Sequence, residues 1–213
     1  MSNKKQKLEL TWIGKNNPEY DIANIEPRIL VENPDLSNVT NAPDTENMII
    51  HGDNLLALKA LLPEYEGKVK CIYIDPPYNT GNAFEHYDDN VEHSTWLSLM
   101  KPRLELLKLL LSDDGVIFVQ IDDNEQAYLK ILMDEIFGRN NFLNTISVKA
   151  KVSAGASGGG EDRKLKKNIE YVLFYAKNYQ RFLKFNEILE EENLFELINE
   201  MRDQGKSWKY TRV

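Results

Sequence analysis

Short apolar runs alternate with longer stretches in which apolar residues recur every three or four positions. The uninterrupted runs predict buried strands at residues 48–51, 69–74, 116–121 and 142–148. The spaced stretches predict amphipathic helices at residues 55–62, 97–111 and 128–136. Strands that alternate with helices in this way are typical of a parallel sheet with right-handed crossovers. The pattern therefore predicts an α/β fold with a doubly wound, Rossmann-like sheet.

Different patterns flank this central stretch. Residues 1–46 show little periodicity and contain four prolines, which predicts a non-globular arm that wraps the domain. Residues 151–213 begin with a Ser/Gly-rich loop, followed by a predicted strand at 169–176 and an acidic helix at 187–201. We therefore expect three regions, at residues 1–46, 47–150 and 151–213.

An acid, two prolines and an aromatic residue directly follow the predicted strand at residues 69–74. Proline donates no backbone hydrogen bond and fixes its own φ, so the strand should end at Asp75 and continue as a rigid, extended track. The carboxyl ends of strands in open α/β sheets are where ligands bind. There the Asp75 carboxylate and the Pro76 carbonyl can accept the two hydrogens of an exocyclic amine, and Tyr78 can stack on a base. The alternative, a turn that only ends a strand, is disfavoured by its place in a strand–helix–strand unit.

The segment Asp75-Pro76-Pro77-Tyr78 resembles the Asp-Pro-Pro-Tyr motif of amino-group DNA methyltransferases. Similarity to the modification (Mod) subunits of type III restriction–modification systems extends over most of the chain, through residues 51–56, 79–82, 96–107, 115–123 and 168–177. The resemblance implies a permuted methyltransferase fold that transfers a methyl group from S-adenosylmethionine to adenine N6 in double-stranded DNA. In this family the four motif residues would hold and activate a flipped-out adenine, and Asp at the first position favours adenine over cytosine. It also implies a restriction (Res) subunit as a partner, and it allows a homodimer.

Asp53 follows the predicted strand at residues 48–51 and precedes a predicted helix. In the family, an acid at this strand end lies near the adenosine of the cofactor. An Asp before an amphipathic helix is also a common N-cap. The two roles are compatible, and the sequence does not separate them.

The family also uses a Phe-x-Gly-x-Gly turn that cradles the methionine part of the cofactor. None of the 11 glycines of this chain lies in such a turn. The chain thus resembles only the first part of such an enzyme, with residues 47–150 as a partial catalytic domain and residues 151–213 leading toward the target-recognition region. A catalytically inactive remnant that binds DNA or a partner subunit is the alternative.

The formal net charge of −8 gives no overall signature of nucleic-acid binding, so a DNA contact would need a local patch. Residues 149–184 hold nine Lys or Arg against three acids. The expected phosphate contacts are Lys149, Lys151, Arg163, Lys164, Lys166 and Lys167. A solvated loop beside a hairpin is the alternative.

The sequence also indicates the compartment of the protein and its ability to bind a metal. The lone cysteine, Cys71, suits a reducing compartment and is expected as a small core residue. With no signal-peptide pattern and no apolar run of membrane-spanning length, we expect a cytoplasmic protein. The acids and histidines of residues 85–93 lack the fixed spacing of metal ligands, so we expect a solvated loop and no metal.

Overall fold

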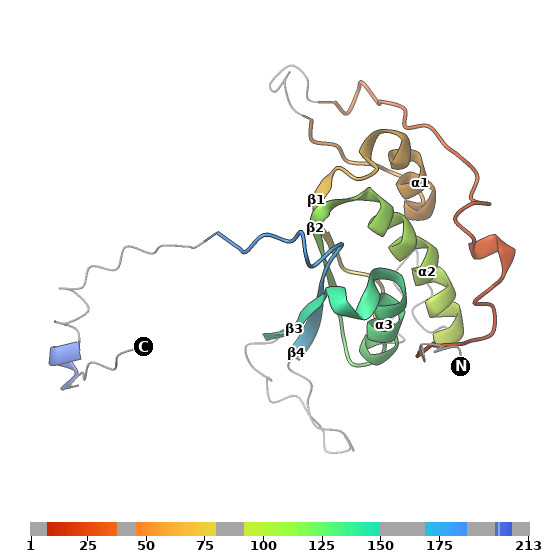
Figure 1. Cartoon of the computed structure of the whole chain (residues 1–213). Coiled ribbons are helices and arrows are strands. Elements are labelled where there is room, and N and C mark those ends of the chain that lie inside the picture. Colours follow the sequence, from red (N-terminus) through yellow and green to blue (C-terminus); the bar gives the residue numbers. More distant parts are fainter. Residues whose placement is uncertain are drawn as a thin grey trace, which may run out of the picture. The chain divides into compact units, whose positions relative to one another are not determined.

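The computed structural model describes residues 8–37, 46–79, 92–149, 169–186, 199 and 201–205. The chain divides into two compact units, Met1–Phe182 and Leu183–Val213. The first unit contains the sheet and the helices that pack on it (Figure 1). The predicted helix at residues 187–201 lies almost entirely outside the described residues.

The described part of the first unit contains three α-helices and four strands. The helices are α1 (Asn54–Tyr65), α2 (His93–Leu110) and α3 (Gln126–Met133). The strands are β1 (Val69–Ile74), β2 (Leu111–Ile121), β3 (Phe142–Lys149) and β4 (Ile169–Ala176). Short helical turns occur at Pro18–Tyr20, Asp134–Gly138 and Arg139–Asn141. None of the helices among the described residues is long and apolar enough to cross a membrane.

The strands form one mixed sheet in the order β1-β2-β4-β3. β1 and β2 are parallel, as expected for two strands that α2 connects as a crossover. β4 is antiparallel to both β2 and β3. The predicted α/β class and incomplete Rossmann-like sheet are confirmed, and the antiparallel pairs add a feature that the alternating pattern did not predict.

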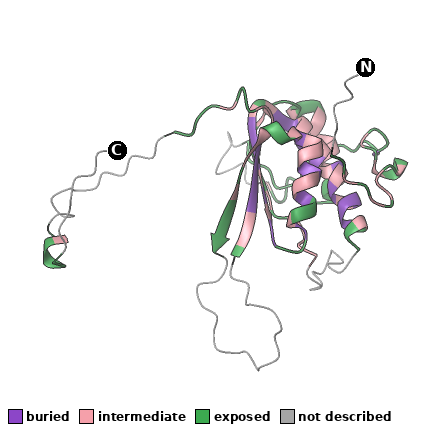
Figure 2. Cartoon of the chain, turned by 60° about the horizontal axis from the view of Figure 1, so that its bottom comes forward, coloured by how far each residue is buried: buried purple, intermediate pink, exposed green. Residues whose placement is uncertain are grey.

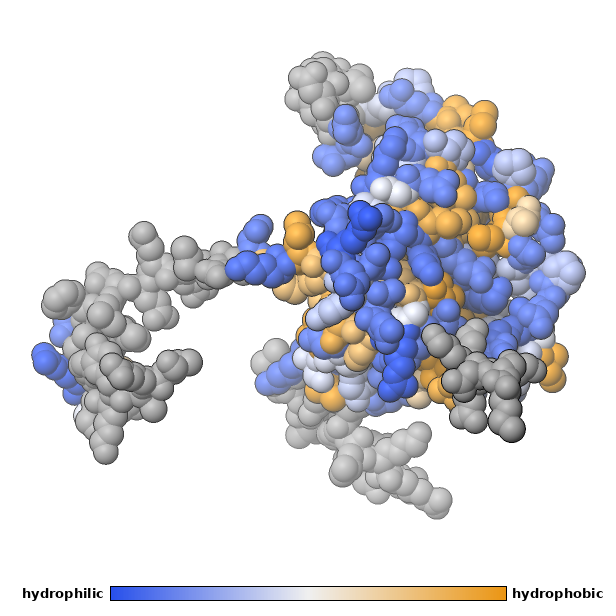
Figure 3. Space-filling view, viewed as in Figure 1, coloured by the Kyte–Doolittle hydropathy of each residue, from blue (hydrophilic) through white to orange (hydrophobic). Residues whose placement is uncertain are grey.

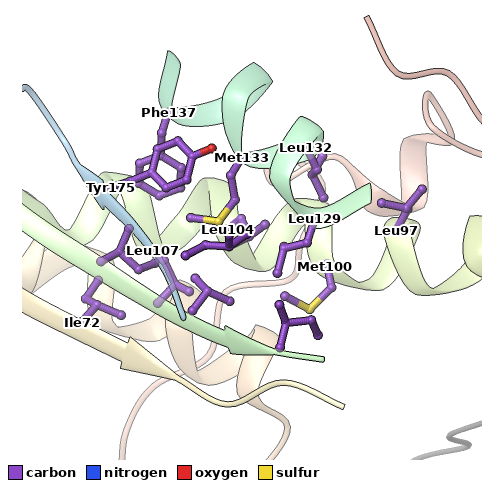
Figure 4. Packing of buried hydrophobic residues seen from close by; sticks show 14 of the residues in the cluster. Ile72, Leu97, Met100, Leu104, Leu107, Leu129, Leu132, Met133, Phe137 and Tyr175 are labelled. Atoms are coloured by element: carbon purple, nitrogen blue, oxygen red, sulfur yellow. The ribbon is translucent and has the colours of Figure 1, made fainter. Parts of the chain in front are cut away.

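The core lies between the sheet and the three helices, which pack on the same face (Figures 1 and 2). Ile72, Ile117 and Tyr175 point toward the helices from three neighbouring strands. Leu104 of α2 and Leu129 of α3 meet them and are completely buried (Figure 4 shows this packing). The apolar stripe read from the sequence of α2 is therefore the contact surface of this helix.

The opposite face of the sheet carries a smaller apolar cluster of Val116, Phe174 and Ala176. No helix among the described elements covers it (Figure 2). Cys71 points to this side and is exposed, so its prediction as a core residue is wrong. The reason is the alternation of side chains in a strand: Ile72 faces the helices, so its neighbour Cys71 must face away.

The expected strand at residues 48–51 is also absent, because residues 46–51 have no regular structure. Met48 and Ile49 are exposed rather than buried. β1 is the edge strand of the described sheet and has no neighbour on its outer side among the described residues. An apolar run becomes a strand only where its backbone groups find partners, and here they find none in the described sheet.

β2 begins five residues earlier than expected, at Leu111 instead of 116, and the residues between Leu111 and Val116 form a bulge within it. The pairing with β1 shifts register between Val69 and Cys71. A Cβ atom at Gly115 would lie 2.8 Å from the backbone oxygen of Val69. Glycine is therefore required here by the close approach of the two strands.

The described part of the N-terminal arm packs along the helices (Figure 1). The Trp12 indole donates a hydrogen bond of 2.9 Å to Ser98 Oγ of α2. Lys15 pairs with Glu135 at 2.8 Å, and Lys59 of α1 donates to the carbonyl of Ile22 at 2.7 Å. Hydrophobic residues nevertheless gather on the visible surface around α1 and the arm (Figure 3).

Replacing Leu104 by Ala should lower the free energy of unfolding by about 2–5 kcal/mol, because it opens a cavity between α2 and the sheet. Chemical denaturation followed by circular dichroism measures this loss. Leu36→Ala is the matched control, because Leu36 is 83% exposed and should cost little. Equal losses for the two variants would contradict the assignment of the core.

Candidate active site

The segment from Asp75 to Tyr78 leaves the sheet at the carboxyl end of β1. Because β2 is parallel to β1 and antiparallel to β4, the carboxyl ends of β1 and β2 meet the amino end of β4 there. Asp75 is exposed, and the next three residues are partly buried. The expected site therefore lies where three strands present their ends.

Trp96 anchors the double proline from the first turns of α2. Its indole is 2% exposed, and Nε1 donates a hydrogen bond of 2.8 Å to the carbonyl oxygen of Pro77. The Pro77 carbonyl is therefore engaged within the protein, and the role of the Pro76 carbonyl as an acceptor stays a prediction.

The Tyr78 hydroxyl lies between two carboxylates. It donates a hydrogen bond of 3.0 Å to Glu170 Oε2 at the start of β4, and the Asp75 carboxylate is also within hydrogen-bonding reach. Burial, together with these two carboxylates, raises the pKa of Tyr78 well above its ordinary value. Tyr78 therefore stays neutral, which suits a ring that stacks rather than transfers a proton.

Glu170 is itself held by Gln120 of β2, whose Nε2 donates to the same oxygen at 2.6 Å. The Tyr73 hydroxyl donates in turn to Gln120 Oε1. A chain of polar side chains thus crosses the uncovered face of the sheet and ends at Tyr78. Each member fixes the next, so the orientation of the tyrosine ring depends on β2 and β4.

The next residue, Asn79, is held by a different acid, Glu125, which precedes α3. Its Nδ2 donates a hydrogen bond of 2.7 Å to Glu125, which also contacts Nδ1 of His93 at 2.7 Å. The sequence did not single out Glu125, and it placed His93 in a solvated loop. From the sequence, Glu170 is only one of three acids in the basic region. Its position at the start of an apolar strand is the signal that could have indicated a functional acid.

Asp53 acts as the N-cap of α1. Its Oδ1 accepts hydrogen bonds from the backbone N–H groups of Leu55 at 2.9 Å and Leu56 at 3.1 Å, which confirms the capping role. The side chain is 51% exposed, and its Oδ2 lies 3.8 Å from Arg103. A contact with the cofactor stays a prediction.

The predicted DNA-contacting residues are largely not visible. Lys149 is exposed at the end of β3. The other five, Lys151, Arg163, Lys164, Lys166 and Lys167, lie outside the described residues. Lys177, which belongs to the same basic region, donates to the Leu111 carbonyl and so supports the fold. No group of three or more metal-binding side chains occurs in the described part of the chain.

Glu170→Gln should lower the pKa of Tyr78, because it removes one of the two carboxylates that disfavour the phenolate. The NMR signal of tyrosine labelled with ¹³C at Cζ follows the ionisation of each ring in an alkaline titration. In the unaltered chain, the Tyr78 ring should remain neutral well above the ordinary range of a tyrosine, because its pKa is raised. Glu66→Gln, an exposed change at the end of α1, should leave Tyr78 unchanged. A Tyr78 signal that does not respond to Glu170→Gln would contradict the contact.

Comparison with curated proteins finds several relatives much longer than this chain. A probable type III restriction-modification enzyme HindVI Mod subunit from Haemophilus influenzae is 55% identical over 79% of this chain and 22% of its own length. The type III EcoPI Mod subunit of Escherichia phage P1 is 34% identical over 82% of this chain and 31% of its own. The chain thus matches about a fifth to a third of the length of these relatives.

The solved structures that are similar to this chain include the M1.HpyAVI–SAM complex. The two sequences are 19% identical, and the TM-score is 0.44 over 67% of this chain and 60% of that chain. The sequence also matches a family described as DNA methylase (N6_N4_Mtase) over residues 69–212, which includes Asp75 to Tyr78. A match over this share of the chain establishes the relationship: the protein belongs to the DNA methylase family.

Proposed function

We propose that this chain is the amino-terminal part of a modification subunit that methylates adenine N6 in double-stranded DNA with S-adenosylmethionine. The observation that carries the proposal is that the motif residues Pro77 and Tyr78, which follow Asp75 and Pro76, are held in place by hydrogen bonds. Trp96 binds the Pro77 carbonyl and Glu170 binds the Tyr78 hydroxyl, so the two expected acceptors, Asp75 and Pro76, precede a held aromatic ring. The similarity to Mod subunits supports the choice of DNA as the substrate.

The chemistry follows from the two acceptors. The lone pair of an adenine amine is delocalised into the ring, which makes the nitrogen a poor nucleophile. Hydrogen bonds from its two N–H groups to Asp75 and Pro76 favour a pyramidal nitrogen and localise the lone pair. S-adenosylmethionine, when bound, supplies a methyl group on a positively charged sulfur. Asp75 and Pro76 would hold the amine so that its lone pair could accept the methyl group as the sulfur releases it, and Asp75 or water would take the amine proton.

Tyr78 has a second task in this scheme. Its hydroxyl is within reach of the Asp75 carboxylate when no base is present. An incoming amine competes for that carboxylate, and Glu170 keeps the hydroxyl when Asp75 gives it up. The ring can then stay in place and stack on the flipped base, which contributes about 1–3 kcal/mol. The basic region at residues 149–184 supplies phosphate contacts.

Cofactor binding needs more than the described residues offer. Asp53 fits a contact with adenosine, because its side chain is half exposed and only Oδ1 is used for capping. No Phe-x-Gly-x-Gly turn occurs in the chain. We infer that a segment outside this sequence supplies that turn, with the uncovered edge of β1 as its neighbour. The longer protein acts in the cytoplasm, assembles with a Res subunit and is compatible with a homodimer.

Asp75→Ala in the longer protein should reduce methyl transfer by at least about 10²-fold, since it removes one of two groups that stabilise the developing charge. Transfer of a tritiated methyl group to duplex DNA, with digestion to identify N6-methyladenine, measures the effect. Asp35→Ala, on the exposed arm, is the matched control and should leave the rate unchanged. Unaltered adenine methylation by the Asp75→Ala protein would refute the assignment.

The alternative is a remnant that binds DNA or a partner subunit but does not transfer a methyl group. The missing glycine turn favours this reading for the isolated chain. We expect calorimetry to detect no binding of S-adenosylmethionine by the isolated chain and clear binding by the longer protein. Cofactor binding by the isolated chain at comparable affinity would instead show that the chain needs no further segment.

A further inference from the structure

Asn79 ends the motif segment in an unusual backbone conformation. Its φ of +58° makes it the one non-glycine residue with positive φ in the described part of the chain. The left-handed region is uncommon for residues that carry a side chain, and Asn is among those that tolerate it best. Such a conformation persists where its surroundings enforce it, and it often marks functional sites.

Glu125 contacts the side chain of Asn79. Its side chain is completely buried, and its Oε1 accepts the hydrogen bond from Asn79 Nδ2. Glu125 occupies the N-cap position of α3, yet its carboxylate makes no capping hydrogen bond. Its second oxygen, Oε2, is buried without any hydrogen-bond partner in the part of the chain that the structure describes. A carboxylate that is costly to bury and does not cap its helix needs another reason to be there.

His93 completes the contact from α2. Its Nδ1 lies 2.7 Å from the same oxygen of Glu125, so the ring can donate to it in the tautomer that carries the proton on Nδ1. The ring of Tyr128 from α3 packs against it, with centroids 4.8 Å apart. Three residues on, Trp96 binds the Pro77 carbonyl. The start of α2 therefore holds the segment on both sides of Tyr78: directly at Pro77, and through Glu125 at Asn79.

We propose that Glu125 is a positioning residue for the methylation site: with His93 it locks Asn79 in the left-handed conformation and so sets the direction in which Tyr78 and the Pro76 carbonyl face. Glu125 touches none of the reacting atoms and acts only through Asn79. The effect of Glu125 on methylation rests on the proposed function. The contacts of Glu125 with Asn79 and His93 are a property of the isolated chain and can be tested without methyl transfer.

Glu125→Leu tests the lock, because leucine has a similar volume and removes only the acceptor. Leucine removes the cost of burying a charge together with the acceptor that Asn79 and His93 share, so thermal stability should change little, while Asn79 loses the contact that holds its side chain. In NMR spectra of the isolated chain, we expect the signals of the Tyr78 ring and the Trp96 indole to shift and broaden. The signal of the Asn79 side-chain amide should move to the chemical shift of a solvated amide. Glu125→Gln, which retains a carbonyl acceptor, should restore much of the original spectrum.

Two controls separate positioning from general support of the fold. Asp134→Asn alters an acid at the other end of α3 that binds the Tyr175 hydroxyl at 2.8 Å, and it should leave the Tyr78 signals unchanged. Asn79→Gly adopts positive φ at no steric cost, so Glu125→Leu should cause little further change in the Trp96 signal in that background. The proposal is overturned if Glu125→Leu destabilises the chain and leaves the signals of Tyr78 and Asn79 as they were.

In the longer protein, Glu125→Leu should lower kcat for methyl transfer by about 10²-fold, the cost of a misplaced reacting group, with a smaller change in KM. An unchanged kcat would overturn the positioning role even if the spectra shift. If the longer protein transfers no methyl group but the spectra of the isolated chain respond as expected, the proposed function fails and the Glu125 lock stands.

Discussion

The hydrogen bond from the Trp96 indole to the Pro77 carbonyl is the contact on which the site depends. Two consecutive prolines provide no backbone donor, so hydrogen bonds can hold Pro76 and Pro77 only through their carbonyls. A fully buried indole in the first turns of α2 meets this need. The same helix packs its apolar stripe against the sheet, so the position of the motif is tied to the hydrophobic core rather than to a loop.

Around this anchor, the site uses polar side chains from strands that are distant in sequence. Glu170 reaches Tyr78 because β4 runs antiparallel to β2, which brings its first residues to the carboxyl end of β2. Glu125 reaches Asn79 because β2 ends and α3 begins at the same place. Glu170 and Glu125 thus hold the adjacent residues Tyr78 and Asn79, while Asp75 is exposed. The arrangement separates the groups that hold the motif from the groups that would meet the substrate.

The sheet is asymmetric in a way that bears on function. All three described helices pack on one face, while Cys71 and Tyr73 on the other face are exposed. The outer edge of β1 pairs with no strand among the described residues, and Met48 and Ile49, nearby in sequence, are exposed. An edge strand with apolar residues nearby is a surface that proteins normally cover. This is consistent with the short span of the chain relative to its Mod-subunit relatives.

The sequence by itself determined the α/β class, the strand end at Asp75, the N-cap at Asp53 and the apolar stripe of α2, because each depends on neighbours within a few positions. Proline chemistry and helical or strand periodicity are local and can be read directly. The tertiary structure alone decided that Cys71 faces away from the core, that residues 46–51 form no strand, and that Glu125 and Glu170 hold the motif. These features depend on which strand lies beside which and in which direction, and such long-range pairing leaves no periodic trace in the chain.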